Sequence, residues 1–416
     1  MKNITTHQRQ ALLLYASTVL GVIIGMLNSV LNTRSLPPES FGDVRYVQNL
    51  IAFISSLLLV GFFTSGSRLL ALSKAEEDSR KIRGVMCIIL GVTVAFTMVV
   101  FLSIFLYTKV KDPQSQITRL YLAAIPFCGT NLMLNYVNTT AQGDNHIGRI
   151  SIARLIPSLL YFFIALVLYR LFGATPERML LLNNGISFIV LLIVILSTRP
   201  LFANLRASFA ILKNENKKYG FNVYLGALAS VSTSYIAGIT LGHFCDNNVN
   251  VGFYTLALHL ASPVALLPSI IGTTFFKKFS TENRIGKRIL CSSIGLTMGT
   301  CILFILVIKY VVGILYPESY SNVAIYSSWL VMGTCMHGLG DMFNRFLGAH
   351  GQGRQIRNGA FACGIVLITG SLLLVYFFQI KGAVATKICS SFVYLFSMCF
   401  YYIKTVKKLE KNDKIA

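Results

Sequence analysis

Residues 11–50 read ALLLYASTVLGVIIGMLNSVLNTRSLPPESFGDVRYVQNL. The first half is an apolar run of about 20 residues, long enough for a helix to cross roughly 30 Å of hydrocarbon. The second half is a polar break in which Pro37 and Pro38 end the first span, and Gly42 is expected to help the chain turn into the next. Its carboxylates, Glu39 and Asp43, are expected to lie near water. This alternation of apolar run and polar break predicts consecutive membrane-spanning helices.

The composition extends this prediction to the whole chain of 416 residues. Hydrophobic residues make up 54% of the chain and charged residues 12%, whereas a soluble domain would carry roughly a quarter charged residues. The basic start is followed by an apolar stretch longer than the core of a signal peptide, so we expect this stretch to remain as the first span. We therefore predict an all-α polytopic membrane protein.

Apolar runs and the breaks between them predict about twelve transmembrane helices, whose ends are defined to within a few residues. The predicted spans are 11–33, 46–72, 84–107, 118–141, 150–172, 178–198, 220–244, 252–276, 288–315, 322–347, 358–379 and 382–403. The longest break, residues 199–219, divides them into two six-helix lobes, residues 1–205 and residues 206–416. An even number of helices per lobe implies that the lobes are related by an axis along the membrane normal.

Basic residues in the connections predict the orientation of these helices. On the side of the two termini the connections carry 26 Lys and Arg residues, against 9 on the opposite side. Because basic loops stay in the cytoplasm, both termini are expected there. The formal net charge of +22 therefore reflects the topology and also attracts anionic lipid. We expect no nucleic-acid partner.

The sequence has no signature of an enzyme, a metal site or a disulfide framework. It contains no P-loop, GxSxG or HExxH motif, and no extramembrane segment is long enough for a catalytic domain. The nine cysteines form no CxxC pair, and isolated cysteines in apolar helices usually act as small fillers. We therefore expect no catalytic residues, no metal and no cofactor.

Polar residues follow one face of the predicted fourth span. Asn131, Asn135, Asn138 and Gln142 are spaced by four, three and four residues, which places them on one side of a helix. Several amides facing lipid would be unfavourable. They therefore either form hydrogen bonds between helices or face a wet cavity that binds a hydroxyl-rich ligand.

The predicted first span repeats this spacing with Gly21, Gly25, Asn28 and Asn32. The two glycines form a small-xxx-small motif that favours close contact with another helix. Asn28 and Asn32 are expected to face the same space as the amides of the fourth span.

Ionisable residues inside the predicted spans are few. His337, Asp341 and Asn344 share a helix face in the tenth span, and Asp341 is also spaced for an ion pair with Arg345. The pattern predicts either that local ion pair or a carboxylate that binds a proton or a cation, with His337 beside it.

Three basic residues also fall within or at the ends of predicted spans. Arg68, Arg154 and Lys387 either extend to the headgroups or reach into a cavity. In a cavity, the planar donor fork of an arginine would bind a phosphate well.

Five stretches of the sequence match elements of one family of membrane proteins. R-S-L-P-P-E-S-F-G (Arg34–Gly42) follows the predicted first span, and G-F-F-T-S-G-S-R-L-L-A (Gly61–Ala71) ends the predicted second span. The others are the region Ser230–Phe276, the run N-R-F-L-G-A-H-G-Q-G-R (Asn344–Arg354) and K-G-A-V-A-T (Lys381–Thr386). These motifs resemble those of the polysaccharide flippases of the multidrug/oligosaccharidyl-lipid/polysaccharide (MOP) exporter superfamily, and the O-antigen flippase (Wzx-type) branch fits best.

The resemblance implies two six-helix lobes around a central cavity, which opens alternately to the two sides of a bacterial inner membrane. The expected cargo is an undecaprenyl-diphosphate-linked oligosaccharide repeat unit, of O-antigen or capsule type, moved from the cytoplasmic to the periplasmic leaflet. Membrane lipids and polysaccharide assembly proteins are the expected partners.

On this hypothesis the candidate residues divide by chemistry. Arg34, Arg68, Arg154 and Lys387 suit phosphate, and Asn28, Asn131, Asn135, Asn138 and Gln142 suit sugar hydroxyls. Asp341 and His337 are candidates for coupling to a proton or sodium gradient, and the membrane potential is a further source of energy. The alternatives are a multidrug/cation antiporter of the same superfamily, and an integral-membrane polysaccharide polymerase or acyltransferase.

Overall fold

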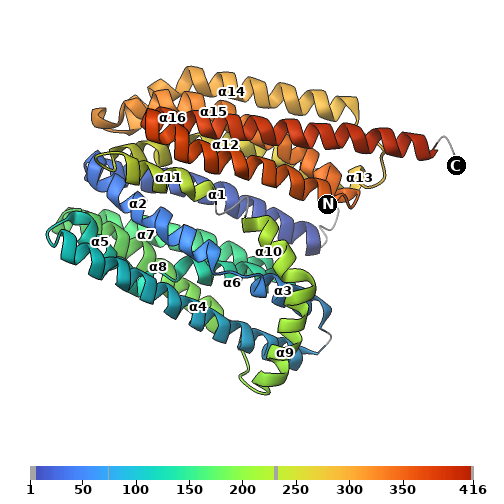
Figure 1. The fold of residues 1–416 in the computed structure, drawn as a ribbon, viewed down its shortest axis with the longest axis horizontal. Coiled ribbons are helices and arrows are strands. Elements are labelled where there is room, and N and C mark those ends of the chain that lie inside the picture. The colour runs from blue at the N-terminus through green and yellow to red at the C-terminus, as the bar shows by residue number, and fades with distance from the viewer. Residues whose placement is uncertain (1–5, 74, 229–232, 414–416) are drawn as a thin grey trace. The chain divides into compact units, whose positions relative to one another are not determined.

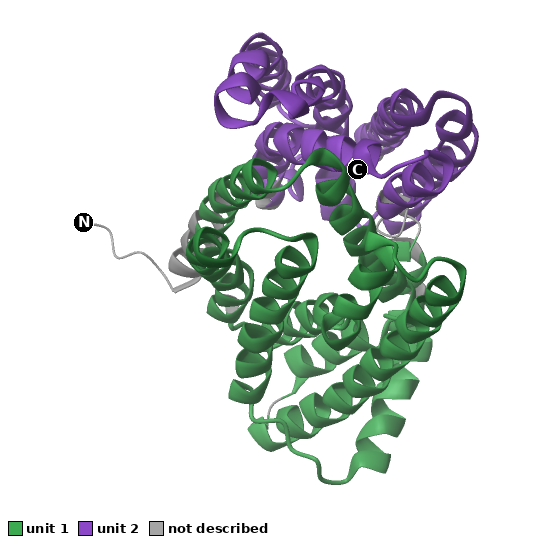
Figure 2. Ribbon diagram, turned by 90° about the vertical axis from the view of Figure 1, so that its left-hand side faces the viewer, with its two compact units in different colours: residues 1–228 green, residues 229–416 purple. Residues whose placement is uncertain are grey.

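The computed structural model describes residues 6–73, 75–228 and 233–413, and the regular structure in these ranges is helical throughout (Figure 1). The chain divides into two compact units, unit 1 (Met1–Leu228) and unit 2 (Ala229–Ala416), coloured separately in Figure 2. Helices satisfy their backbone hydrogen bonds internally, which hydrocarbon requires. The prediction of an all-α fold is confirmed.

Unit 1 consists of long and short helices joined by short turns. In its described part these are α1 (Thr6–Ser35), α2 (Pro38–Leu57), α3 (Phe62–Leu72), α4 (Glu76–Lys111), α5 (Gln116–Ala124), η1 (Ile125–Phe127), α6 (Thr130–Gly143), α7 (Ile147–Phe172), α8 (Pro176–Ser197), α9 (Leu205–Glu215), η2 (Asn216–Gly220) and α10 (Phe221–Ala227).

The polar break that follows the first span contains the start of a helix, and two expectations about it are wrong. The α1 helix ends at Ser35 and α2 begins at Pro38, because a proline is well tolerated in the first turn of a helix. Gly42 therefore lies inside α2 and makes no turn. Asp43, one residue later, is only 7% exposed, so it lies within unit 1 and away from water.

The predicted second span, 46–72, is not one helix. The α2 and α3 helices are bent by 60° at a short break. Val60 and Gly61 both have a positive φ there, of 44° and 81°, a conformation that glycine adopts readily and valine rarely does. The break leaves carbonyl groups without helical partners, and neighbouring side chains must bind them.

The connecting segment, residues 199–228, supplies those partners. Asn216 donates a hydrogen bond to the Val60 carbonyl over 3.1 Å and accepts one from Ser65, also over 3.1 Å. Tyr224 donates to the Leu57 carbonyl over 2.7 Å. The α9 and η2 helices thus pack on α3 and belong to unit 1. The predicted lobe boundary between residues 205 and 206 stays a prediction.

Unit 2 is built around α15, which packs against α12, α14 and α16. Its described helices are α11 (Thr233–Phe244), α12 (Val249–Thr274), α13 (Phe276–Phe279), α14 (Lys287–Leu315), η4 (Glu318–Tyr320), α15 (Asn322–Ala349) and α16 (Gly353–Asp413). An apolar core formed by residues such as Phe279, Met342, Phe346 and Met398 joins three of them.

The α16 element contains two spans. Its 61 residues would extend about 90 Å as one helix, three times the thickness of the hydrocarbon. Gln379 has non-helical angles and divides it. An added Cβ on Gly382 would overlap the Leu374 carbonyl oxygen, so only glycine fits this tight turn, which lies in the K-G-A-V-A-T motif.

With α16 counted once, seven helical segments in the described ranges are long and apolar enough to cross a membrane, or eight if the bent pair α2–α3 is one span. Many apolar side chains on these segments are exposed, including Val92, Phe96 and Val99 on α4 and Leu303 and Leu306 on α14. Such surface requires lipid. The chain is a multi-pass membrane protein, and the number twelve stays a prediction.

Candidate functional site

The four carboxamides predicted to share a helix face all lie on α6. The buried side of α6 carries residues such as Met133, Tyr136 and Val137, and the carboxamides lie on its less buried side. Asn131 and Gln142 are exposed, while Asn135 and Asn138 are half-buried. The fourth span itself is interrupted before this helix, because η1 with Pro126 separates α5 from α6.

No side-chain hydrogen bond joins these four carboxamides to another described residue, and the Asn138 Oδ1 atom is buried without a partner there. Within the described part of unit 1 these amides therefore form no hydrogen bonds that join one helix to another. They offer donors and acceptors to a ligand or to water.

The two asparagines of α1 have different surroundings. Asn28 donates a hydrogen bond to the Ser158 carbonyl of α7 over 2.9 Å. Asn32 is 1% exposed and accepts hydrogen bonds from Tyr161 over 2.5 Å and Tyr169 over 3.3 Å. The expectation that Asn32 faces an open space is wrong, because it joins α1 to α7.

The arginines of unit 1 that are candidates for phosphate binding are exposed. Arg34 lies in the last turn of α1, and Arg154 lies on α7 without an ion pair to another described residue. Arg68 forms an ion pair with Glu215, and its guanidinium lies 5.3 Å from the centre of the Tyr219 ring. The pair offsets part of the Arg68 charge, but the side chain is 50% exposed and keeps donors that Glu215 does not use.

In unit 2 the structure gathers the predicted polar residues of α15 around one side chain that sequence reasoning missed, Tyr394 of α16. The Tyr394 hydroxyl donates to Asp341 over 2.9 Å and accepts from Asn344 over 2.8 Å. The His337 ring stacks on the Tyr394 ring with 4.4 Å between centres. Gly340 makes this possible, because an added Cβ would lie 2.6 Å from the Tyr394 ring.

Lys387 lies on α16 two turns before Tyr394, on the same face of that helix, and is counted with this cluster. Arg345, the spaced ion-pair partner of Asp341, is exposed and forms no salt bridge with it in the described part of the chain. The α15–α16 cluster (His337, Asp341, Asn344, Lys387 and Tyr394) thus places one carboxylate, one amine and one imidazole together. The sequence does contain a signal for Tyr394, because it lies seven residues after Lys387 and therefore on the same helix face.

A second group missed from sequence is a network of ion pairs near the ends of α4, α6, α7 and α8. Arg83 binds Asp144 over 3.0 Å, Glu76 over 2.9 Å and the Thr198 carbonyl over 3.0 Å. The side chains of Arg83 and Asp144 are only 6% and 5% exposed. Arg149 adds a contact to Asp144 over 3.5 Å. This network joins four helices at the side predicted to be cytoplasmic.

Comparison with known proteins identifies the family. Residues 8–281 match the family described as polysaccharide biosynthesis protein. No curated protein matches the sequence. At the low sequence identities of the solved structures that do match, the similarity shows the fold.

The solved structures that match include transporters and a flippase. An inward-facing multidrug resistance transporter of the MATE family in the MOP superfamily matches with a TM-score of 0.71 and 13% identity, over 94% of this chain and 96% of that chain. The lipid II flippase MurJ matches with a TM-score of 0.70 and 12% identity, over 97% and 91%. A MOP-superfamily transporter from Pyrococcus furiosus matches with a TM-score of 0.59 and 14% identity, over 97% and 95%. This chain has the fold of the MOP superfamily, and it belongs to the polysaccharide biosynthesis protein family.

Proposed function

We propose that the protein is a flippase for undecaprenyl-diphosphate-linked oligosaccharide repeat units, of O-antigen or capsule type. It moves them from the cytoplasmic to the periplasmic leaflet of a bacterial inner membrane by alternating access, with both termini in the cytoplasm. The match to polysaccharide biosynthesis proteins over residues 8–281 carries this proposal, and the similarity to a lipid II flippase supports it.

The carboxamides of α6 have the chemistry that such a cargo needs. Moving a sugar head through bare hydrocarbon would remove hydrogen bonds from many hydroxyls, at several kcal/mol for each uncompensated group. Asn131, Asn135, Asn138 and Gln142 have no protein partners among the described residues. In a wet cavity these amides form hydrogen bonds to the sugar hydroxyls, in place of the bonds that the hydroxyls make to water in solution. The polyprenyl tail stays in lipid.

The charges also fit an anionic cargo. In this proposal Arg34, Arg68 and Arg154, all exposed, bind the diphosphate. An inside-negative potential favours outward movement of an anion by about 2.3 kcal/mol per charge per 100 mV, and a diphosphate with two charges gains about twice that. In this proposal Asp341, His337 and Lys387 form the site of any coupling to protons or sodium ions.

The test is complementation in a strain that lacks its own flippase. Without the protein, lipid-linked repeat units should accumulate facing the cytoplasm and the surface polymer should disappear. Lectin binding to sealed membrane vesicles of known sidedness reports which face the units occupy. Unchanged polymer in a strain without a redundant flippase contradicts the proposal.

A matched pair of variants tests the α6 residues. Asn135→Ala combined with Asn138→Ala removes two carboxamides, and two hydrogen bonds of about 0.5–1.5 kcal/mol each correspond to roughly a tenfold slower flipping rate. Asn183→Ala, at a half-buried asparagine of α8, should flip at the parental rate. Equal rates for the double variant and the parent would remove α6 from the site.

A second candidate follows from the similarity to multidrug resistance transporters. As a cation antiporter, the protein would export organic cations such as ethidium from whole cells in exchange for protons or sodium ions. Ethidium efflux that depends on Asp341, in a strain whose polymer is unaffected by the protein, would favour this candidate over the flippase.

A further inference from the structure

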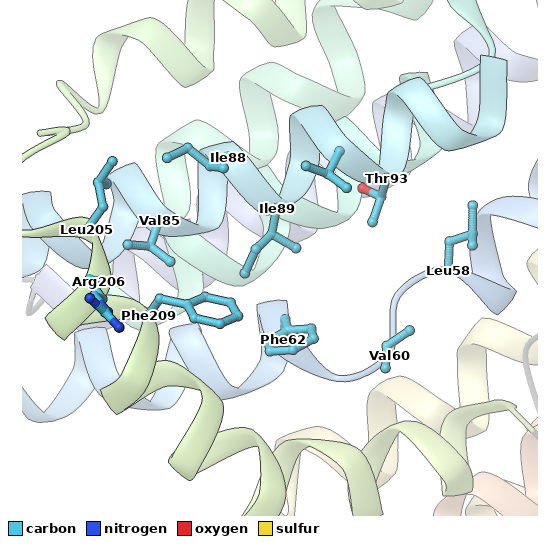
Figure 3. A pocket seen from close by; sticks show the side chains of 11 residues that line it. Leu58, Val60, Phe62, Val85, Ile88, Ile89, Thr93, Leu205, Arg206 and Phe209 are labelled. Atoms are coloured by element: carbon cyan, nitrogen blue, oxygen red, sulfur yellow. The ribbon is translucent and has the colours of Figure 1, made fainter. Parts of the chain in front are cut away.

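A pocket of about 620 Å³ opens on unit 1 where α4 and α9 meet the α2–α3 break. Its walls are almost entirely apolar, with Phe62, Ile89 and Phe209 among the residues that line it (Figure 3). Phe62 and Phe209 stack with 6.3 Å between ring centres and form one wall. A space of this size holds a ligand as large as a drug molecule.

The two ends of this α4–α9 pocket differ in polarity. Arg206 lies at one end near Leu205 and Val85, and Leu58 and Thr93 lie at the other (Figure 3). Val85 and Thr93 are eight residues apart on α4, so the pocket is about 12 Å long. The Thr93 hydroxyl donates to the Leu90 carbonyl over 3.0 Å, which leaves the far end apolar. The shape matches an amphiphile with its head at Arg206.

Arg206 is exposed and forms no hydrogen bond or ion pair with another described residue. Arg206, Phe209 and Lys213 are spaced by three and four residues, so they share one face of α9. Lys213 is exposed and likewise has no partner in the part of the chain that the structure describes. Arg206 is thus the cation that lines the pocket, and Lys213 follows two turns later on α9. The ligand that complements a free cation at one end of an apolar pocket is an anion with a hydrocarbon chain.

The charge around the pocket is one-sided. The connecting segment contains five basic residues between Arg199 and Lys218 and a single acid, Glu215. Arg68 already binds that acid. The Arg206 end of the pocket also lies toward the start of α4, on the side that basic residues predict to be cytoplasmic. Anionic lipid headgroups are attracted to basic segments at this level of a membrane.

We propose that the α4–α9 pocket is a binding site for an anionic phospholipid, with its phosphate on Arg206 and an acyl chain against Phe62 and Phe209. This lipid is distinct from the transported cargo. It fills the space between the connecting segment and α4. Lipid binding at this pocket therefore does not depend on the proposed flippase activity.

Fluorescence quenching in vesicles tests this site. The chain has a single tryptophan, Trp329 in α15, so the variant Trp329→Phe with Phe209→Trp reports from the pocket alone. The full-length protein is reconstituted in phosphatidylcholine vesicles with increasing fractions of dibrominated phosphatidylglycerol or dibrominated phosphatidylcholine. We expect phosphatidylglycerol to occupy the pocket with an affinity about fivefold higher than phosphatidylcholine.

Two controls separate a specific site from general contact with lipid. Ile189→Trp, in the Trp329→Phe background, reports from an exposed position of α8 where no Lys or Arg occurs between Arg178 and Arg199. We expect no preference there. Arg206→Gln should reduce the preference at position 209 to about onefold, and Arg206→Lys should retain most of it. Ile88→Trp, on the α4 wall, provides a second reporter in case Phe209→Trp does not fold.

Two results would overturn the proposal. The first is an equal preference at positions 209 and 189, or one that Arg206→Gln leaves unchanged. The second is loss of quenching when a small fraction of undecaprenyl phosphate is added, since the pocket would then hold the cargo carrier. Flipping of lipid-linked oligosaccharide by the same proteoliposomes is a separate measurement, so failure of one proposal does not hide the other.

Discussion

At the scale of single residues, the hydroxyl of Tyr394 is bonded to two polar side chains of a neighbouring helix. It donates to Asp341 and accepts from Asn344, and its ring carries His337. Hydrogen bonds of this kind fix the rotation of α15 relative to α16, because the apolar contacts around them are less directional. The residue therefore acts as a structural support for a carboxylate that is a candidate for ion coupling.

Tyr394→Phe keeps the ring and removes only the hydroxyl. Asp341 and Asn344 then both lose a partner, and we expect the free energy of unfolding to fall by about 1–3 kcal/mol. Thermal and denaturant unfolding in detergent measure the change. Tyr376→Phe, at a tyrosine that is 61% exposed on the same element, should have no effect. Equal stability of both variants would show that the hydroxyl of Tyr394 does not stabilise the cluster.

The pair Arg83–Asp144 provides a second prediction for single residues. Asp144→Asn removes the charge of the buried carboxylate that pairs with the buried Arg83. Removing one partner of a buried ion pair lowers the free energy of unfolding by about 3–5 kcal/mol. Glu76 contacts the same guanidinium but is 72% exposed, so Glu76→Gln should change stability by less than about 1 kcal/mol. The ratio of the two effects is measured by unfolding in detergent, and similar effects would contradict the assignment.

At the scale of elements, the break between α2 and α3 depends on a segment far along the chain. Asn216 and Tyr224 bind the carbonyls of Val60 and Leu57, which the break leaves without helical partners. Inside a membrane an unbonded carbonyl is unfavourable. The bend and the connecting segment therefore form one structural element, although more than 150 residues separate Val60 from Asn216.

Asn216→Ala removes both of its hydrogen bonds at the break. We expect the unfolding free energy of unit 1 to fall by about 1–3 kcal/mol, and proteolysis within the connecting segment to become faster. The matched control is Asn214→Ala, at an exposed asparagine of α9 that should tolerate the change. Protease protection equal to that of the parent would show that the segment is held by other contacts.

At the scale of the whole molecule, the excess of basic residues on one side predicts the topology. We expect green fluorescent protein fused after Ala416 to be fluorescent, because it folds in the cytoplasm, and alkaline phosphatase fused after Asp112 to be active, because it requires the periplasm. Alkaline phosphatase fused after Arg83 should be inactive. An active fusion after Arg83 with an inactive one after Asp112 would invert the orientation.

Hydropathy and spacing predicted the helical fold and the common face of the α6 amides, because a membrane helix expresses both directly in its sequence. They could not predict the break at Val60, since valine rarely adopts a positive φ and the bend depends on Asn216. Asp43 was placed in water because its segment looked like a loop, whereas Pro38 begins a helix there. The role of Tyr394 could not be predicted, because its partner Asp341 lies on another helix, α15, and the sequence does not show that α15 and α16 are neighbours.

The connecting segment also determines at which position the chain can be divided into two separately expressed polypeptides. A gene divided after the codon for residue 228 would leave Glu215, Asn216 and Tyr224 on the same polypeptide as Arg68 and the bent second span. A division after residue 204 would transfer them to the other polypeptide, which would have to restore these contacts by association. Co-expression of the first pair of fragments should therefore give more assembled protein than co-expression of the second.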